Sequence, residues 1–177
     1  MESRKLKLDE LGRLEVEEYK LIPKVPIIVI LDNIRSALNV GSVFRTSDCL
    51  AIEKVILCGI TARPPHKEIF KSAIGATESV EWEYYESINE VTEALKDTTL
   101  ISIEQTTHSK TLHDIETLHI KDKVALILGN EVNGVSDAFI QKSDYCIEIP
   151  QFGTKHSFNV SVCSGIVLWE FAKLLRK

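Results

Sequence analysis

The stretch CIEIPQFGTKHSFNVS, residues 146–161, decides the fold of this chain. Its first residues predict a strand that ends at Pro150, and a polar loop follows. From residue 157 to residue 175 the apolar residues recur at helical spacing, which predicts a long final helix. Parallel α/β folds bind their ligands where a strand passes through a polar loop into a helix. We therefore expect a ligand site at this loop.

Runs of apolar residues without polar alternation indicate further strands, buried on both faces of a parallel sheet. They predict strands at residues 27–31, 55–58, 100–103 and 124–128; residues 79–83 are a short strand candidate, and a further strand is predicted at residues 145–149. Helical spacing predicts helices at residues 39–51 and 87–96, and another that passes through Phe139. This alternation predicts an α/β fold, with a mostly parallel sheet of about six strands covered by helices on both faces.

Length and composition limit the class of protein. We expect residues 26–177 to form one domain of ordinary size, preceded by an N-terminal arm, residues 1–25, whose leucines predict a short helix. The chain is 44% hydrophobic and 27% charged, as is usual for soluble globular proteins. Its net charge of -5 excludes a protein that coats nucleic acid by bulk charge, but it leaves room for a local basic patch.

Membrane, redox and metal chemistry are not indicated by the sequence. No apolar run is long enough to span a membrane. The four cysteines are dispersed, so we expect reduced thiols and a cytoplasmic protein. The histidines lack the spacing of metal ligands, and we expect no metal site.

Polar segments follow three of the buried strands, and in a parallel sheet all three lie at the same carboxyl edge. They supply amides, hydroxyls, one carboxylate, two arginines and glycines that allow close backbone approach. Each residue also has an ordinary interpretation: Asn39 and Ser157 as helix caps, the glycines as turn residues, Arg45 and Glu131 as solvated surface charges. Their arrangement, rather than any single residue, indicates a site.

The three segments resemble, in order and spacing, the three motifs of the SPOUT superfamily of RNA methyltransferases, SpoU/TrmH class. They are NIRSALNVGSVFR (33–45), LGNEVNGVS (128–136) and IPQFGTKHSFNVS (149–161), and KSAIGA (71–76) resembles a further family element. The resemblance covers residues 26–175. Two departures are small: Val132 stands where the family has glycine, and Phe158 stands where leucine is common.

The resemblance implies S-adenosylmethionine as the cofactor and a deep trefoil knot in the C-terminal part of the fold. The loops that follow residues 128 and 149 would be knot loops that hold the cofactor largely through backbone groups. By position, the cofactor site would be lined by Ile103, Gly129, Ile149, Ser157 and Phe158. Glu104 is the alternative to Ile103.

The resemblance also implies methyl transfer to a ribose 2′-hydroxyl of RNA. This hydroxyl is a very weak acid, so the enzyme must assist its deprotonation and align it. Arg45 is the implied catalytic residue, either as the base or as a group that positions the ribose phosphate, since a neutral arginine is costly. Supporting catalytic positions are Asn39, Glu131, Ser157 and Asn159. We expect both asparagines to orient Arg45 and Glu131 to pair with it.

Substrate and partners complete the expectation. Only 26 residues precede the first predicted strand, so we expect RNA to bind the catalytic domain, the arm and a partner subunit. Proteins that this chain resembles are homodimers, packed through the C-terminal helix and the motif-one helix. The compact size favours tRNA over ribosomal RNA. Candidate phosphate contacts are Arg35, Arg63, Lys67, Lys71 and Lys155.

Two alternatives come from other classes. One is a SPOUT-fold RNA-binding protein without methyl transfer. The presence together of Arg45, Asn39, Glu131, Ser157 and Asn159 argues against it. The other is a flavodoxin-like or receiver domain, which requires a phosphate loop or an acidic cluster at the first strand. Only Asp32 is present there.

Overall fold

A seven-stranded parallel sheet forms the centre of the computed structural model, which describes residues 3–176. The strands lie in the order β3-β2-β1-β6-β4-β7-β5, and every pairing between them is parallel. Their bounds are β1 Val25–Asp32, β2 Ile52–Cys58, β3 Glu81–Tyr85, β4 Thr99–Ile103, β5 Lys110–Thr111, β6 Val124–Leu128 and β7 Tyr145–Glu148. The sheet has one strand more than expected, because the two residues of β5 pair with β7 and are too short to show a pattern.

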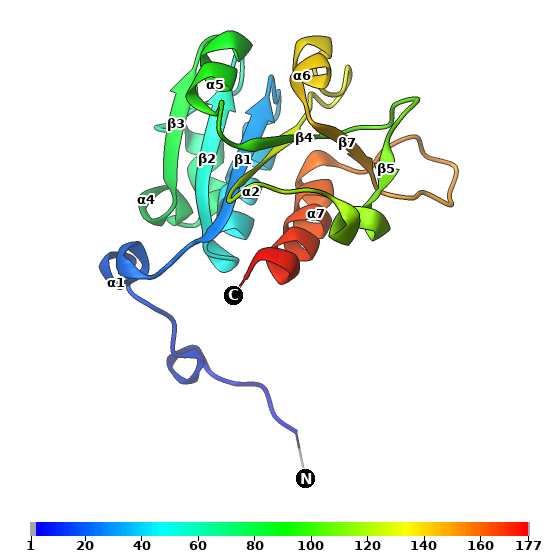
Figure 1. The fold of residues 1–177 in the computed structure, drawn as a ribbon. Helices are drawn as coiled ribbons and strands as arrows, with labels where there is room; N and C mark the ends of the chain where they lie inside the picture. The colour runs from blue at the N-terminus through cyan, green and yellow to red at the C-terminus, as the bar shows by residue number, and fades with distance from the viewer. Residues whose placement is uncertain (1–2, 177) are drawn as a thin grey trace.

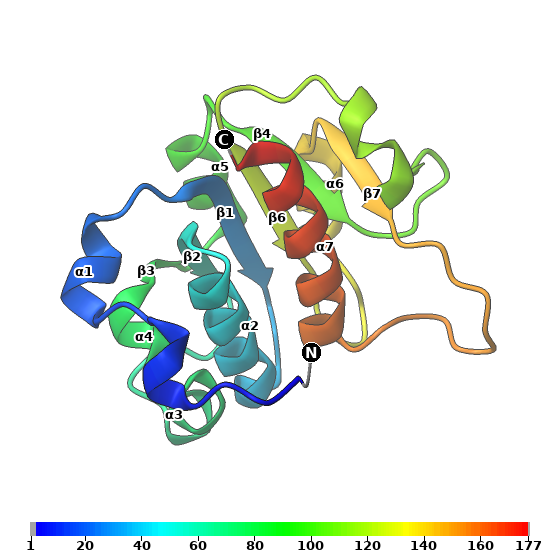
Figure 2. The ribbon, with the colours of Figure 1, turned by 90° about the horizontal axis from the view of Figure 1, so that it is seen from below.

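Helices cover both faces of the sheet, as expected (Figure 1). Alternate residues of β1 enter two separate cores: Val29 and Leu31 face one, Ile28 and Ile30 the other. The first core is covered by α2 Ala37–Cys49, α3 Lys67–Ala73, α4 Ala76–Ser79, the 3-10 helix η2 Leu112–Thr117 and α7 Val160–Leu175. The second is covered by α5 Ile88–Ala94 and α6 Asp137–Lys142. Seen from below, α2 and α7 lie side by side (Figure 2).

Two predicted helix caps are wrong. The Ser36 hydroxyl accepts the Asn39 N–H at 3.3 Å and caps α2, so Asn39 lies in the first turn. The Asn159 side chain accepts the Ser161 N–H at 2.9 Å and caps α7, so Ser157 remains in the preceding loop. Both shifts leave the side chains of Asn39 and Ser157 available to the carboxyl edge of the sheet.

The arm does not form the single helix that its leucines predict. Gly12, with a φ of 56°, separates the 3-10 helix η1 Leu8–Leu11 from α1 Val16–Leu21. The α1 helix contacts α4 and buries Tyr19, while the chain before it extends away from the sheet (Figure 1). Within residues 3–176, no helix is long and apolar enough to cross a membrane.

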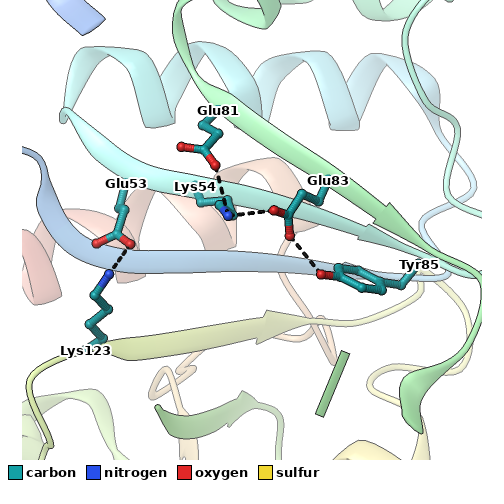
Figure 3. Close-up of polar contacts among 6 residues, drawn as sticks. All are labelled: Glu53, Lys54, Glu81, Glu83, Tyr85 and Lys123. Atoms are coloured by element: carbon teal, nitrogen blue, oxygen red, sulfur yellow. Dashed lines mark hydrogen bonds and ion pairs between the residues drawn. The ribbon is translucent and has the colours of Figure 1, made fainter. Parts of the chain in front are cut away.

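Charged side chains occupy β2 and the edge strand β3, as Figure 3 shows. Lys54 Nζ lies 2.9 Å from Glu81 and 2.7 Å from Glu83, and the Tyr85 hydroxyl donates to Glu83 at 2.9 Å. Burial acts to lower the pKa of Lys54, but the two glutamates outweigh it and raise that pKa. A charged edge disfavours pairing with a further strand, so this cluster has a structural explanation.

Candidate active site

A cavity of about 670 Å³ lies at the carboxyl ends of β4, β6 and β7. Its wall includes apolar side chains of all three strands, and its rim is formed by the loops that follow them. All five residues expected to line a cofactor site line this cavity: Ile103, Gly129, Ile149, Ser157 and Phe158. The alternative, Glu104, lines it as well. The fold thus gathers these residues from three segments into one place.

The loop after β6 closes on itself through its backbone. Asn130 and Gly134 exchange two N–H···O bonds, each 2.9 Å long, and Gly134 has a φ of 70°. A Cβ on Gly129 would overlap the Val135 nitrogen and the Gly134 carbonyl, so only glycine fits there. The Glu104 carboxylate accepts the Val135 N–H at 3.0 Å and supports the loop from β4.

Glu131 joins this loop to the segment after β1. Its two carboxylate oxygens accept the N–H groups of Arg35 at 2.8 Å and Ser36 at 3.0 Å, and the side-chain amide of Asn39 at 3.0 Å. Burial acts to raise the pKa of Glu131, but these hydrogen bonds outweigh it and hold the pKa below the ordinary value of glutamate. The expected pairing with Arg45 is not formed: among residues 3–176, the donors to the Glu131 carboxylate come from the motif-one loop and from Asn39.

Asn39 extends the same connection to the third motif. Its side-chain oxygen accepts an N–H of Asn159 at 3.3 Å, and Asn159 in turn caps α7. Glu131, Asn39 and Asn159 therefore form one hydrogen-bonded chain across the three motifs. Ser157 and Asn159 also line the cavity, so the chain runs along its rim.

Two further residues at the strand ends hold the loops together, and neither was among the predicted site residues. Asp32 is fully buried and accepts the N–H groups of the Asn33 amide and of Ser136, each at 2.7 Å. The Asn130 amide donates to the Asn33 carbonyl at 2.7 Å. Asp32 ends β1, and Asn130 lies in the loop that follows β6. Their position at the end of a buried strand is the signal that could have identified them.

Arg45 lies outside the cavity. It is exposed on α2, on the side of Leu38 and Ser42, and it follows Asn39 by six positions, about 9 Å of helix. Among residues 3–176, none hydrogen-bonds or ion-pairs with its guanidinium. Helical side chains lean toward the helix N-terminus, and the N-terminal turn of α2 carries Asn39, which contacts Glu131.

The five predicted phosphate contacts fall into two groups. Arg35 follows β1 and donates its N–H to Glu131, and Lys155 is exposed in the loop after β7. Arg63, Lys67 and Lys71 lie instead on the segment after β2 and on α3. Basic groups therefore border the carboxyl edge of the sheet at two separate places.

A family model described as the SpoU rRNA Methylase family matches residues 26–169. The chain belongs to this family. The match begins in β1 and ends in α7, so it includes all seven strands and the three motifs that surround the cavity.

Relatives of this SpoU-family chain are named as RNA methyltransferases. It is 32% identical over 149 residues to an "Uncharacterized tRNA/rRNA methyltransferase" of Borreliella burgdorferi, covering 84% of this chain and 64% of the relative. It is 30% identical over 147 residues to a "23S rRNA (guanosine-2'-O-)-methyltransferase RlmB" of Neisseria meningitidis, covering 82% of this chain and 57% of the relative. The chain thus spans less than two thirds of the length of these relatives.

Solved structures show the same fold as this SpoU-family chain. The TrmH/SpoU tRNA modifying enzyme of A. aeolicus matches with a TM-score of 0.77 at 22% identity, over 89% of this chain and 79% of that chain. AviRb from Streptomyces viridochromogenes, in complex with AdoMet, matches with a TM-score of 0.75 at 23% identity, over 89% of this chain and 60% of that chain. At these identities the likeness concerns the fold alone.

The pKa of Glu131 predicts how stability depends on pH. A carboxyl whose pKa is depressed by folding stabilises the fold above its unfolded pKa of about 4.3, and that contribution is lost as pH falls through the folded pKa. We therefore compare the free energy of unfolding of the wild type with that of Glu131→Gln. The difference between them is expected to be constant above the unfolded pKa and to shrink below it. Urea unfolding from pH 7 downward measures both curves, and two parallel curves would contradict the expectation.

Proposed function

We propose that this SpoU-family chain transfers a methyl group from S-adenosylmethionine to a ribose 2′-hydroxyl of RNA. One observation carries the proposal: the hydrogen-bonded chain of Glu131, Asn39 and Asn159 joins all three motifs at the rim of one cavity. The names of the relatives support the reaction, and the AdoMet complex of a protein with this fold supports the cofactor.

The cavity suits S-adenosylmethionine in size and chemistry. Its volume, about 670 Å³, lies in the range of sites for ligands of this size. Ile103 and Ile149 offer apolar surface and Phe158 an aromatic ring for the adenine, while Gly129 and Ser157 offer backbone and hydroxyl groups for polar atoms. The bound cofactor supplies a methyl group on a positively charged sulfur. The loops after β6 and β7 hold it in position.

For the RNA we assign a positioning role to the rim. An exposed arginine stays charged and binds phosphate well, so Arg45 contacts the phosphate of the target nucleotide and aligns its 2′-hydroxyl. Asn39 and Asn159 shape the rim beside it. Glu131 is a weak base, because its pKa is lowered. Its oxygens accept three N–H groups, so its role is to hold the motif-one loop.

We propose that two copies pack through α2 and α7. These helices lie side by side, and Leu38, Val162 and Trp169 are exposed on them. Such packing would place a partner subunit beside the rim of the cavity.

Trp169→Glu is expected to convert the dimer to a monomer. Trp169 is 56% exposed, so the change leaves the core intact but places a charge in the proposed interface. Sedimentation equilibrium measures the mass of the variant. Leu21→Glu, a comparable change on α1, is the control and is expected to remain dimeric. A wild type that is monomeric at micromolar concentration would end the dimer proposal.

We also propose the C-terminal knot that the motifs imply. The sheet order supports it, since β6 lies between β1 and β4, and α7 returns from the loop after β7 to contact β1. An unbroken crystallographic trace of residues 99–175 decides this, and an unthreaded path would end the proposal.

We also propose a cytoplasmic location, because an RNA substrate and free cysteines are both typical of that compartment. Cell fractionation tests this location.

Two measurements test the proposed reaction. Calorimetry with S-adenosylmethionine is expected to show one site per chain, and no binding at millimolar cofactor would favour an RNA-binding protein without methyl transfer. Mapping of 2′-O-methyl groups in total RNA, with and without the gene, is expected to show one lost position. Whether it lies in tRNA or in ribosomal RNA identifies the substrate.

A further inference from the structure

Helix α3 presents apolar and basic side chains together on its outer face. Phe70 is 48% exposed and Ile74 is 68% exposed. Lys67 and Lys71 are exposed beside them, because residues three and four positions apart share a helix face. Because both apolar side chains are this exposed, neither belongs to the buried core. This face of α3 therefore has no evident role within the chain.

The backbone at Ile74 makes this exposure more informative. Ile74 ends α3 with a φ of 49°, in the left-handed region that β-branched residues avoid. A glycine or asparagine would satisfy this C-cap at lower cost. An exposed isoleucine at a strained position gains nothing from burial within the chain, and contact with another molecule would explain why it is there.

Arg63 adds a stacked cation at the same end of the sheet. Its guanidinium lies 4.3 Å from the centroid of the Tyr84 ring, and the Tyr84 hydroxyl donates to the Gly59 carbonyl at 3.0 Å. Arg63 is nevertheless exposed. The tyrosine thus orders the guanidinium while part of it remains open to a ligand.

This surface is rigidly joined to the motif-one segment. The Ser72 hydroxyl donates to the Leu38 carbonyl at 2.9 Å, and a Cβ on Gly41 would overlap Ser72. Before α3, the Ile60 N–H donates to the Asn33 side chain at 3.1 Å. Figure 2 shows α3 beside α2. A ligand that covers α3 therefore lies close to the motif-one loop and to the rim of the cavity.

We propose that α3 binds an unpaired segment of the RNA substrate, with a base stacked on Phe70 and the flanking phosphates on Lys67, Lys71 and Arg63. Bases in single-stranded loops stack on aromatic rings, whereas those in a duplex are inaccessible to them. The proposal rests on the proposed function and narrows its substrate to RNA with an unpaired loop near the methylated ribose. A second copy of the chain is the less favoured occupant, because the basic side chains would lose their solvation there without an anionic partner.

Fluorescence anisotropy with two RNAs of equal length tests this, one a hairpin with an unpaired loop and the other a full duplex. Phe70→Ala is expected to weaken hairpin binding about tenfold, and Phe70→Leu should do the same because it keeps apolar volume but lacks the ring. Phe70→Trp should bind as the wild type, with added indole fluorescence that the hairpin quenches. Replacing Lys67 and Lys71 with glutamine should lower the salt slope by about 2.

The outcomes separate this proposal from the reaction itself. Unchanged hairpin affinity in Phe70→Ala, or equal affinity of the wild type for duplex and hairpin, overturns the stacking surface even if methyl transfer is present. A loss of dimer mass in Phe70→Ala assigns the face to a second copy instead. Loop binding through Phe70 without S-adenosylmethionine binding supports this surface and removes the methyltransferase proposal.

Discussion

Replacing Arg45 with alanine is expected to lower the rate of methyl transfer by a factor of about 10²–10⁴, the usual size of one well-placed catalytic or positioning group. Arg45 is exposed and does not line the cavity, so folding and affinity for S-adenosylmethionine should be unchanged. Single-turnover transfer of a labelled methyl group measures the rate, and calorimetry measures cofactor affinity. A rate near that of the wild type would remove Arg45 from the mechanism.

Arg45→Lys distinguishes the two roles open to this residue. Lysine keeps the positive charge but lacks the planar fork that binds phosphate in two places. If Arg45 positions the phosphate, the lysine variant should retain part of the rate with an unchanged pH profile. If Arg45 removes the proton, the pH dependence of the rate should shift, because lysine loses its proton at lower pH than arginine.

Gly129→Ala is expected to weaken S-adenosylmethionine binding at least about tenfold and to lower the free energy of unfolding by about 1–3 kcal/mol. The added Cβ would overlap the Val135 nitrogen and the Gly134 carbonyl, which are backbone atoms of the loop closed by Asn130. The loop must shift to admit the methyl group, and it forms part of the cavity wall. Calorimetry and urea unfolding measure the two effects.

Gly153→Ala is the matched control for this change. It lies in the loop after β7 at the same edge of the sheet, but a Cβ there would meet no atom within 4 Å. Its cofactor affinity and stability should stay close to those of the wild type. Equal losses in both variants would show that the close backbone approach at Gly129 is not the cause.

Local patterns predicted most strands, the helices α2, α5, α6 and α7, and much of the cavity lining, but not α3, α4 or η2. Apolar runs predict strands that are buried on both faces, as β1, β4 and β6 are. Six of the seven strands were predicted, including the edge strand β3, whereas the two-residue β5 has no pattern of its own. The predicted cofactor residues, such as Gly129 and Ser157, line one cavity because parallel strands direct their following loops to one edge. Helix starts were less accurate, since Ser36 and Asn159 compete with nearby polar residues as caps.

The sequence alone determined the α/β class, the family, and the carboxyl edge of the sheet as the place of the cavity, because these depend on short-range periodicity and on motifs. The tertiary structure decided which polar groups meet. Placement of β6 beside β1 brings Glu131 onto Asn39, 92 residues away, and the expected pairing with Arg45 is not formed. It also left Arg45 outside the cavity and Phe70 exposed on α3. Such contacts depend on strand order and helix packing. These are set by the burial of apolar residues that are far apart in the sequence, which a local sequence pattern does not show.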